Sequence, residues 1–146
     1  MIPIEQCKFI NAVVPAAVNN ATATKVTIDT KGWSHLRVLL SVGVTDCVIT
    51  APKLQDSADD STYADLSGAI LSANVADTDD SKLYAIDVDL TGGNVERYIQ
   101  VHLAVSNATA ANVCATGILS RSNSGSVTGL AENGTAGQGL EELVSA

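Results

Sequence analysis

Apolar and polar residues alternate with a period of two along most of the chain. Successive side chains of a β-strand point to opposite faces of a sheet, so this pattern predicts half-buried strands. Short runs of Gly, Asn, Asp, Ser or Pro separate the segments, which is typical of an all-β sandwich or barrel. The predicted strands are CKFINAVVP, TKVTIDT, HLRVLLSVG, CVITAPKLQDS, TYADL, LYAIDVDLT, RYIQVHLAVS and NVCATGILS.

The alternation also predicts which side chains point into the core. HLRVLLSVG is apolar on both sides in its second half, which indicates a central strand. Pro52 removes a backbone donor from CVITAPKLQDS, so that strand is expected to be an edge or to bulge there. The residues expected to face inward are Val26, Ile28, Leu36, Val38, Leu40, Val42, Tyr84, Ile86, Val88, Leu90, Ile99, Val101, Leu103 and Val105.

Turn residues also predict how some of the strands connect. The step through Gly92 and Gly93 and the loop SNATAAN both favour antiparallel connections between their flanking strands. The run LSGAILSANVAD fits either a strand or a helical turn, because Leu66, Ile70 and Asn74 would share one helical face.

After Arg121 the chain becomes rich in Gly and Ser and poor in large residues. Such a segment buries too little surface to offset the entropy of ordering it. A disordered terminus and an arm that orders on a neighbouring subunit both fit this composition. We therefore divide the chain into a β-sandwich domain with its N-terminal arm, residues 1–121, and a C-terminal arm, residues 122–146, closing in a short amphipathic turn within GLEELV.

Composition and charge narrow the class of protein. With 146 residues, 46% of them hydrophobic and 16% charged, the chain fits one globular domain. The net charge of −8 repels phosphate backbones and anionic membranes, so neither nucleic acid nor a membrane is an expected partner. The N-terminus lacks the features of a signal peptide, and no apolar run approaches the roughly 20 residues of a membrane span. We expect a soluble protein that a signal peptide does not export.

Three cysteines, Cys7, Cys47 and Cys114, cannot all pair within one chain, and none has the spacing of a metal site. Each lies in an apolar, strand-like context, where a thiol behaves as a small hydrophobe. We expect three buried, reduced cysteines made in a reducing cytoplasm.

The acidic segment KLQDSADDSTYADLSGA raises two chemical hypotheses. As a calcium loop counted from Asp56, it has Ala58 at position three, Ser61 at position six and Ser67 at position twelve, where such a loop needs a ligand, Gly and Glu. As a pair of catalytic carboxylates, it lacks aromatic walls and is rich in Ser and Thr, which favours a solvated turn. An irregular calcium site shared with SANVADTDDS stays open.

The remaining candidates for catalysis are weak. His35 and His102 are the two histidines, and each lies on the polar face of a predicted strand without a second metal ligand nearby in the sequence. The chain has no GxSxG nucleophile elbow and no phosphate-binding Gly motif. We predict that the protein is not an enzyme and has no cofactor.

Three pieces of the chain resemble the capsid decoration, or cement, proteins of tailed bacteriophages. They are IDTKGWSHLRVLLSVGVTD, PKLQDSADDSTYADLSGA and ERYIQVHLAVSNATAANVCATGIL. In that family a "D-T-x-G-aromatic" turn precedes an apolar strand, an "L-Q-x-S-x-D" strand follows, and an "R-Y-[IV]-[QR]-V" strand comes late. The family's "D-D-G-S" turn is DDST here, so the turn at residues 59–61 is expected to differ.

This resemblance implies a β-sandwich or jelly-roll-like domain on the outside of an icosahedral head. Its implied partners are the major capsid protein and further copies of the chain, with a homotrimer favoured. It places the protein on the virion surface after synthesis in the host cytoplasm. Residues 1–15 and 122–146 could serve as arms. The residues proposed for the capsid or subunit interface are Phe9, Trp33, His35, Arg37, Leu130, Leu140, Leu143 and Val144.

Two other roles fit the same sequence. One is a carbohydrate- or surface-binding sandwich of a head or tail fibre, for which Trp33 and Tyr63 are the plausible stacking residues. The other is a further virion part, such as a tail-tube or head-completion protein.

Overall fold

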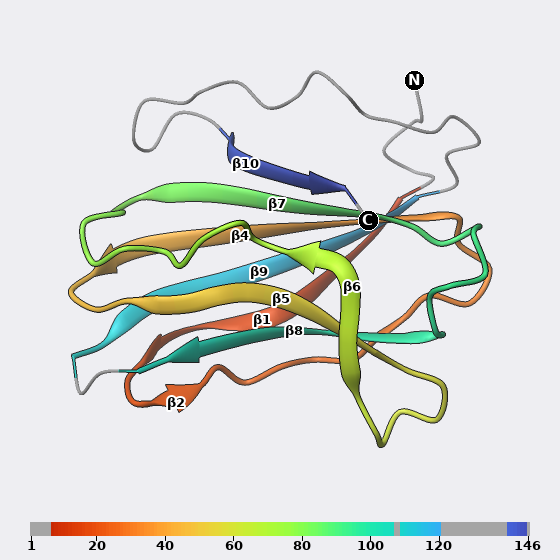
Figure 1. Ribbon diagram of the computed structural model, residues 1–146, viewed down its shortest axis with the longest axis horizontal. Coiled ribbons are helices and arrows are strands. Elements are labelled where there is room, and N and C mark those ends of the chain that lie inside the picture. The colour runs from red at the N-terminus through yellow and green to blue at the C-terminus, as the bar shows by residue number, and fades with distance from the viewer. Residues whose placement is uncertain (1–6, 107–108, 121–139, 146) are drawn as a thin grey trace.

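The computed structural model describes residues 7–106, 109–120 and 140–145 (Figure 1). These ranges contain strands and turns but no helix. The strands are β1 (Lys8–Val18), β2 (Ala21–Thr22), β3 (Ile28–Asp29), β4 (His35–Thr45), β5 (Ile49–Ser57), β6 (Ala64–Ile70), β7 (Lys82–Asp89), β8 (Tyr98–Val105), β9 (Ala111–Ser120) and β10 (Leu140–Ser145).

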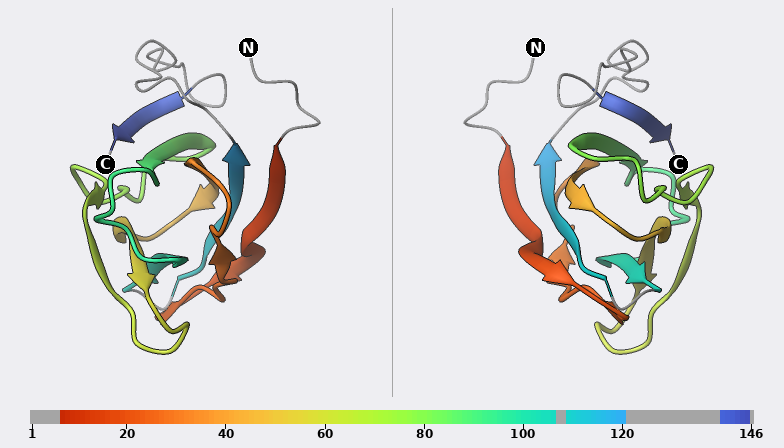
Figure 2. Two further views of the ribbon diagram at one scale, coloured as in Figure 1. Left: turned by 90° about the vertical axis from the view of Figure 1, so that its right-hand side faces the viewer. Right: turned by 90° about the vertical axis from the view of Figure 1, so that its left-hand side faces the viewer.

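The strands form two sheets packed face to face (Figure 2). Sheet A has the order β1-β9-β4-β7-β10, and sheet B has the order β2-β8-β5-β6, with β3 also pairing with β8. Pairing is antiparallel throughout these sheets except between β10 and β7, which run parallel. The predicted all-β, antiparallel sandwich is confirmed.

The order of pairing makes this sandwich a jelly roll. Strand β1 pairs with β9, β2 and β3 pair with β8, β4 pairs with β7, and β5 pairs with β6. Each pair is nested inside the previous one, as when a long antiparallel hairpin is wrapped into two sheets. Pairing of β4 with β9 joins the strand pairs of sheet A, and pairing of β5 with β8 joins those of sheet B. This is the two-sheet architecture of viral capsid and lectin domains.

The alternation along the chain correctly predicts the core. In β4 the even-numbered positions from Leu36 to Val42 are buried, and in β8 the odd-numbered positions from Ile99 to Val105 are buried. Gly117 of β9 lies so close to the opposite layer that a Cβ there would meet Cδ1 of Ile28 at 2.9 Å. The small residues of β9 therefore permit close packing between the two sheets.

Pro52 explains a local irregularity in β5. Pairing of β5 with β8 shifts register between Thr50 and Lys53, so the strand bulges around the proline. The carbonyl oxygen of Pro52 accepts a hydrogen bond from the amide of Leu71 at 2.9 Å. The strand is central in sheet B, so the bulge, and not an edge position, accommodates the missing donor.

Several predicted details are wrong. The Gly92–Gly93 step and the SNATAAN loop do not join paired strands, because β7 and β9 belong to sheet A and β8 belongs to sheet B. TKVTIDT is not one half-buried strand: Lys25 bridges to Val13 of β1, Ile28 pairs in sheet B, and Val26 is exposed. Here the chain crosses between the two sheets, so a single period of two cannot hold.

Two further segments contain strands. LSGAILSANVAD begins within β6 and has no helical turn in it. The residues of GLEELV from Leu140 onward form β10 beside β7 and not an amphipathic turn, so NVCATGILS is not the last strand. Leu130 and the rest of residues 121–139 lie outside the described part of the chain.

Candidate interaction surface

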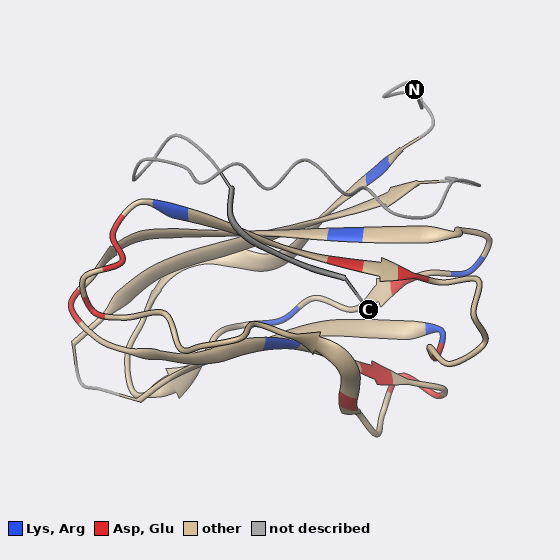
Figure 3. Ribbon diagram, turned by 45° about the horizontal axis from the view of Figure 1, so that its top comes forward, with Lys and Arg blue, Asp and Glu red and all other residues tan. Residues whose placement is uncertain are grey.

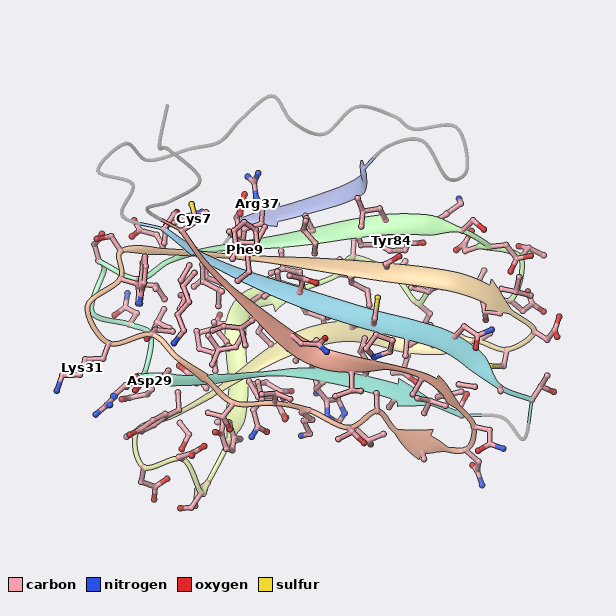
Figure 4. All side chains as sticks on the ribbon, turned by 180° about the vertical axis from the view of Figure 1, so that it is seen from behind. Cys7, Phe9, Asp29, Lys31, Arg37 and Tyr84 are labelled. Atoms are coloured by element: carbon pink, nitrogen blue, oxygen red, sulfur yellow. The ribbon has the colours of Figure 1, made fainter. Side chains whose placement is uncertain are left out.

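The outer face of sheet A brings together residues from five strands. Direct pairing aligns Phe9 with Ile118, Ile118 with Arg37, Arg37 with Asp87, and Asp87 with Ser145. Residues that pair across neighbouring strands lie on one face of the sheet. This line crosses the whole sheet, and we call it the Phe9 row. Figure 4 labels Phe9 and Arg37 at the same end of the sheet.

A charged cluster occupies one half of the Phe9 row. Arg37 donates two hydrogen bonds to Asp87, from Nε to Oδ1 at 2.7 Å and from Nη2 to Oδ2 at 2.6 Å. Nε2 of His35 lies 3.3 Å from Oδ1 of the same carboxylate, whose side chain is only 5% exposed. Burial raises the pKa of Asp87, but the hydrogen bonds from Arg37 and His35 outweigh it and hold that pKa below the ordinary value.

The other half of this face is apolar. Phe9 is a large aromatic residue and is 53% exposed. Ile118, which pairs with it, is half-buried, as are Leu39 and Cys114 further along the same face. A shallow groove of about 390 Å³ lies on the same three strands, between residues 15–17 of β1, Ser41 and Gly43 of β4, and residues 112–114 of β9. An exposed apolar area beside a charged cluster is typical of a protein-binding surface.

The outer face of sheet B has the opposite character. Lys53 Nζ lies 2.5 Å from Asp65 Oδ2, and Gln55 Nε2 donates to Asp65 Oδ1 at 2.8 Å. Gln100 donates to Thr27 Oγ1 at 3.0 Å, in a second group of polar side chains on the same face. These groups hydrogen-bond to one another within this face.

His102 lies among those polar side chains. Its Nδ1 is buried and has no hydrogen-bond partner among the described residues. Burial first, and then the nearby charges of Lys25 and Lys53, lower the pKa of His102. Lys53 is also its direct neighbour in the ladder between β5 and β8.

The acidic segment between β5 and β6 is a hydrogen-bonded turn. Oδ1 of Asp59 accepts hydrogen bonds from the amides of Ser61 and Thr62 and from the hydroxyl of Ser57. Hydrogen bonds from Ser61 and Thr62 hold the pKa of Asp59 well below its usual range. Within this turn the left-handed backbone conformation falls on Asp60, whose φ is 60°. Ser61 has no positive φ, so a serine fits the position at which the decoration-protein motif D-D-G-S has glycine.

The turn is also tied to the rest of the molecule. Oδ1 of Asp60 accepts from Thr27 Oγ1 at 2.9 Å and from the hydroxyl of Tyr63. Among the residues that Figure 3 colours, Asp and Glu positions lie mainly toward the two ends of the sandwich. Among the described residues, no group of three or more His, Cys, Asp or Glu side chains is arranged to hold a metal ion.

The sequence-predicted interface residues fall into three groups. Phe9, His35 and Arg37 lie together on the outer face of sheet A, and β10, which contains Leu140, Leu143 and Val144, pairs with β7 of the same sheet. Trp33 does not join them, because it is half-buried and packs against the core. Leu130 lies outside the described residues.

Sequence reasoning missed two members of this surface. Asp87 and Ile118 complete the Phe9 row, and their contributions depend on pairings between residues far apart in the chain. Asp87 alternates with the inward-facing residues of LYAIDVDLT, and this pattern carries no sign that its side chain is buried. Of the cysteines, Cys47 is buried as expected, whereas Cys7 and Cys114 are half-buried. The described residues include no helix long and apolar enough to cross a membrane.

The chain folds as a jelly-roll β-sandwich, and we compared its sequence and its structure with those of known proteins. No protein-family model and no curated protein sequence matches the chain. The structure is similar to the crystal structure of PBSX exported protein XepA, with a TM-score of 0.56 and 14% identity over 88% of this chain. The chain spans 41% of the length of XepA. At that identity the likeness supports the fold alone.

Two further solved structures are similar at lower scores. The crystal structure of SPBc2 prophage-derived protein YomS has a TM-score of 0.49 and 18% identity, covering 77% of this chain and 91% of that one. The structure of infectious bursal disease virus Gx strain has a TM-score of 0.47 and 10% identity, covering 82% of this chain and 34% of that one.

Proposed function

We propose that the chain is a structural protein of a phage particle, and specifically a decoration protein that binds the outer surface of the head. The observation that carries this proposal is the outer face of sheet A, where an exposed Phe9 and a buried charged cluster lie in one row. The order of the three family-like motifs supports the same role, because all three fall within a jelly roll. In this role the protein is not an enzyme and resides on the virion.

The physical logic of decoration suits such a surface. A head presents many equivalent sites, so a modest contact at each one gives strong retention when copies act together. Partners on the shell would be the major capsid protein and neighbouring copies of this chain, with a trimer favoured. The acidic surface at the ends of the sandwich keeps a densely dressed particle soluble.

A carbohydrate-binding role is less well supported. Sugar platforms stack on exposed aromatic rings, and the two candidates are both engaged. Trp33 packs against the core, and the hydroxyl of Tyr63 bonds to Asp60 and Thr27. No described feature favours a tail-tube or head-completion role over decoration.

Binding to expanded capsids that lack the protein tests this proposal. Wild-type protein at micromolar concentration is expected to co-sediment with such capsids and to raise their melting temperature. Phe9→Glu is expected to lower retention at least roughly tenfold, because a charge replaces an exposed aromatic contact. The matched control is Ile70→Glu, which places the same charge at a 46% exposed residue of sheet B.

Two results would overturn the proposal. One is the absence of wild-type retention on the capsids at micromolar protein. The other is equal retention of Phe9→Glu and wild type, which would move the binding surface away from sheet A. Both variants are expected to melt within a few degrees of wild type, because each replaced side chain is about half exposed.

A further inference from the structure

Strand β10 differs from every other strand of the sandwich. The jelly roll is complete without it, since strands β1 to β9 already make all the nested pairs. It pairs in parallel with β7, at the margin of sheet A, where Leu140 pairs with Leu83 and Ser145 pairs with Asp87 (Figures 1 and 2). It is therefore an added strand on an edge that the core fold leaves open.

Strand β7, which pairs with β10, is buried in the way that is typical of an interior strand. Five consecutive residues of β7, from Tyr84 to Val88, are buried, although alternate ones point out of the sandwich. A strand buried on both faces normally lies inside a sheet, with partners on each side. An uncovered edge of this kind would expose a row of backbone donors and acceptors beside apolar side chains. With β10 in place, β7 has a pairing partner on each side, β4 and β10.

We propose that the β7 edge accepts β10 from a second copy of the chain as well as from its own. The ladder from residues 140–145 to β7 is made by backbone groups, so it is the same whichever copy supplies the strand. Exchange of an identical element between copies creates an interface without any new contact. The interaction surface is the β7 edge, and the partner is the same protein.

Chain length makes the exchange feasible. Residues 121–139 separate β9 from β10 and, fully extended, reach at most roughly 65 Å. Tethering through residues 121–139 holds the strand at an effective concentration on the order of 1 mM beside its own edge. Own-chain pairing therefore dominates in dilute solution, and exchange becomes competitive where copies are packed at millimolar local concentration. This inference does not depend on capsid binding.

Cysteine cross-linking of the full chain tests the exchange. In a background with Cys7, Cys47 and Cys114 replaced, Ala85→Cys is placed on one chain and Leu143→Cys on another, because these positions pair directly. The chains differ in size by a tag, are mixed between 10 μM and 1 mM, and are oxidised briefly. The double variant Ala85→Cys/Leu143→Cys reports the own-chain pair. Ser41→Cys mixed with Leu143→Cys is the control, because Ser41 lies on the same face but pairs with Leu83 and Cys114.

The expected result is a disulfide-linked mixed dimer that increases at least roughly tenfold over that concentration range, while the control mixture stays low. The double variant is expected to form the own-chain disulfide at every concentration. Mixed dimers no more abundant than in the control at 1 mM would overturn the exchange. Failure of the double variant to cross-link would overturn the β7 site itself.

Discussion

At the scale of single residues, the buried carboxylate of Asp87 is the most consequential charge on the outer face of sheet A. Arg37 contacts it with two short hydrogen bonds, and His35 approaches from the neighbouring position on β4. Taking a carboxylate out of water is costly, and only a well-placed partner offsets that cost. Removal of Arg37 is therefore expected to lower the free energy of unfolding.

Arg37→Ala is expected to lower the free energy of unfolding by about 3 kcal/mol or more, because it leaves Asp87 buried without its main partner. The control is Arg97→Ala, which breaks an equally bidentate pair with Asp29 whose side chains are both 43% exposed. That loss should be much smaller, since water screens an exposed pair. Urea denaturation at neutral pH measures both variants. Equal losses would mean that burial of Asp87 has no energetic consequence.

The same residue should make stability depend on pH. Because the folded pKa of Asp87 lies below the unfolded value of about 3.9, its contribution is present above that pH and is lost as the pH falls towards the folded pKa. Wild type should therefore lose more stability between pH 6 and pH 3 than Arg37→Met/Asp87→Leu, which has no carboxylate at that position. Other aspartates with lowered pKa values, such as Asp59 and Asp79, keep some acid sensitivity in both proteins. Parallel stability curves would exclude Asp87 as a contributor.

At the scale of secondary-structure elements, close approach between the two sheets depends on glycine in β9. The nearest atom to an added Cβ at Gly117 would be Cδ1 of the fully buried Ile28, at 2.9 Å. That contact is shorter than van der Waals separation, and the surrounding core leaves the isoleucine little room to move.

Gly117→Ala is thus expected to destabilise the fold by roughly 1–3 kcal/mol through overpacking. Ile28→Val removes the clashing methyl group and alone should cost roughly 0.5–1.5 kcal/mol. The double variant should cost little more than Ile28→Val, giving a favourable coupling in a double-mutant cycle. Gly92→Ala is the matched control, since nothing lies within 4 Å of an added Cβ there. If the losses in free energy of unfolding are additive, an alanine at position 117 does not clash with the Cδ1 methyl group of Ile28.

The elements also show how far the sequence determines this fold. Alternation identifies β4, β7 and β8 and their inward residues correctly, because burial of one face leaves a direct record in each strand. It does not record which strand is the partner. In a jelly roll, strands adjacent in sequence often lie in opposite sheets, so the short Gly92–Gly93 connection was wrongly predicted to join paired strands. The grouping of Phe9, Arg37 and Asp87 depends on the same long-range pairings.

At the scale of the whole molecule, the sandwich presents two unlike outer faces. Sheet B carries polar side chains that bond to one another, whereas sheet A carries the Phe9 row and the added strand β10. Sequence reasoning proposed both an apolar interface and a C-terminal arm, but not that they would share one sheet. Their common location means that loss of the arm should alter the proposed binding face without dismantling the jelly roll.

Truncation after Ser120 tests this relation between arm and sandwich. Strands β1 to β9 remain, so circular dichroism should still show a β-rich fold that unfolds cooperatively. The uncovered β7 edge should lower the melting temperature and promote self-association in light scattering, because its buried strand loses one ladder. Retention on capsids should weaken by at least roughly tenfold, since the arm's contribution to multivalent contact is lost. A full-length control, Leu143→Pro, removes one backbone donor of β10 and should shift the melting temperature in the same direction, by a smaller amount. A truncated protein that melts like wild type and binds capsids equally well would show that the C-terminal arm contributes to neither stability nor attachment.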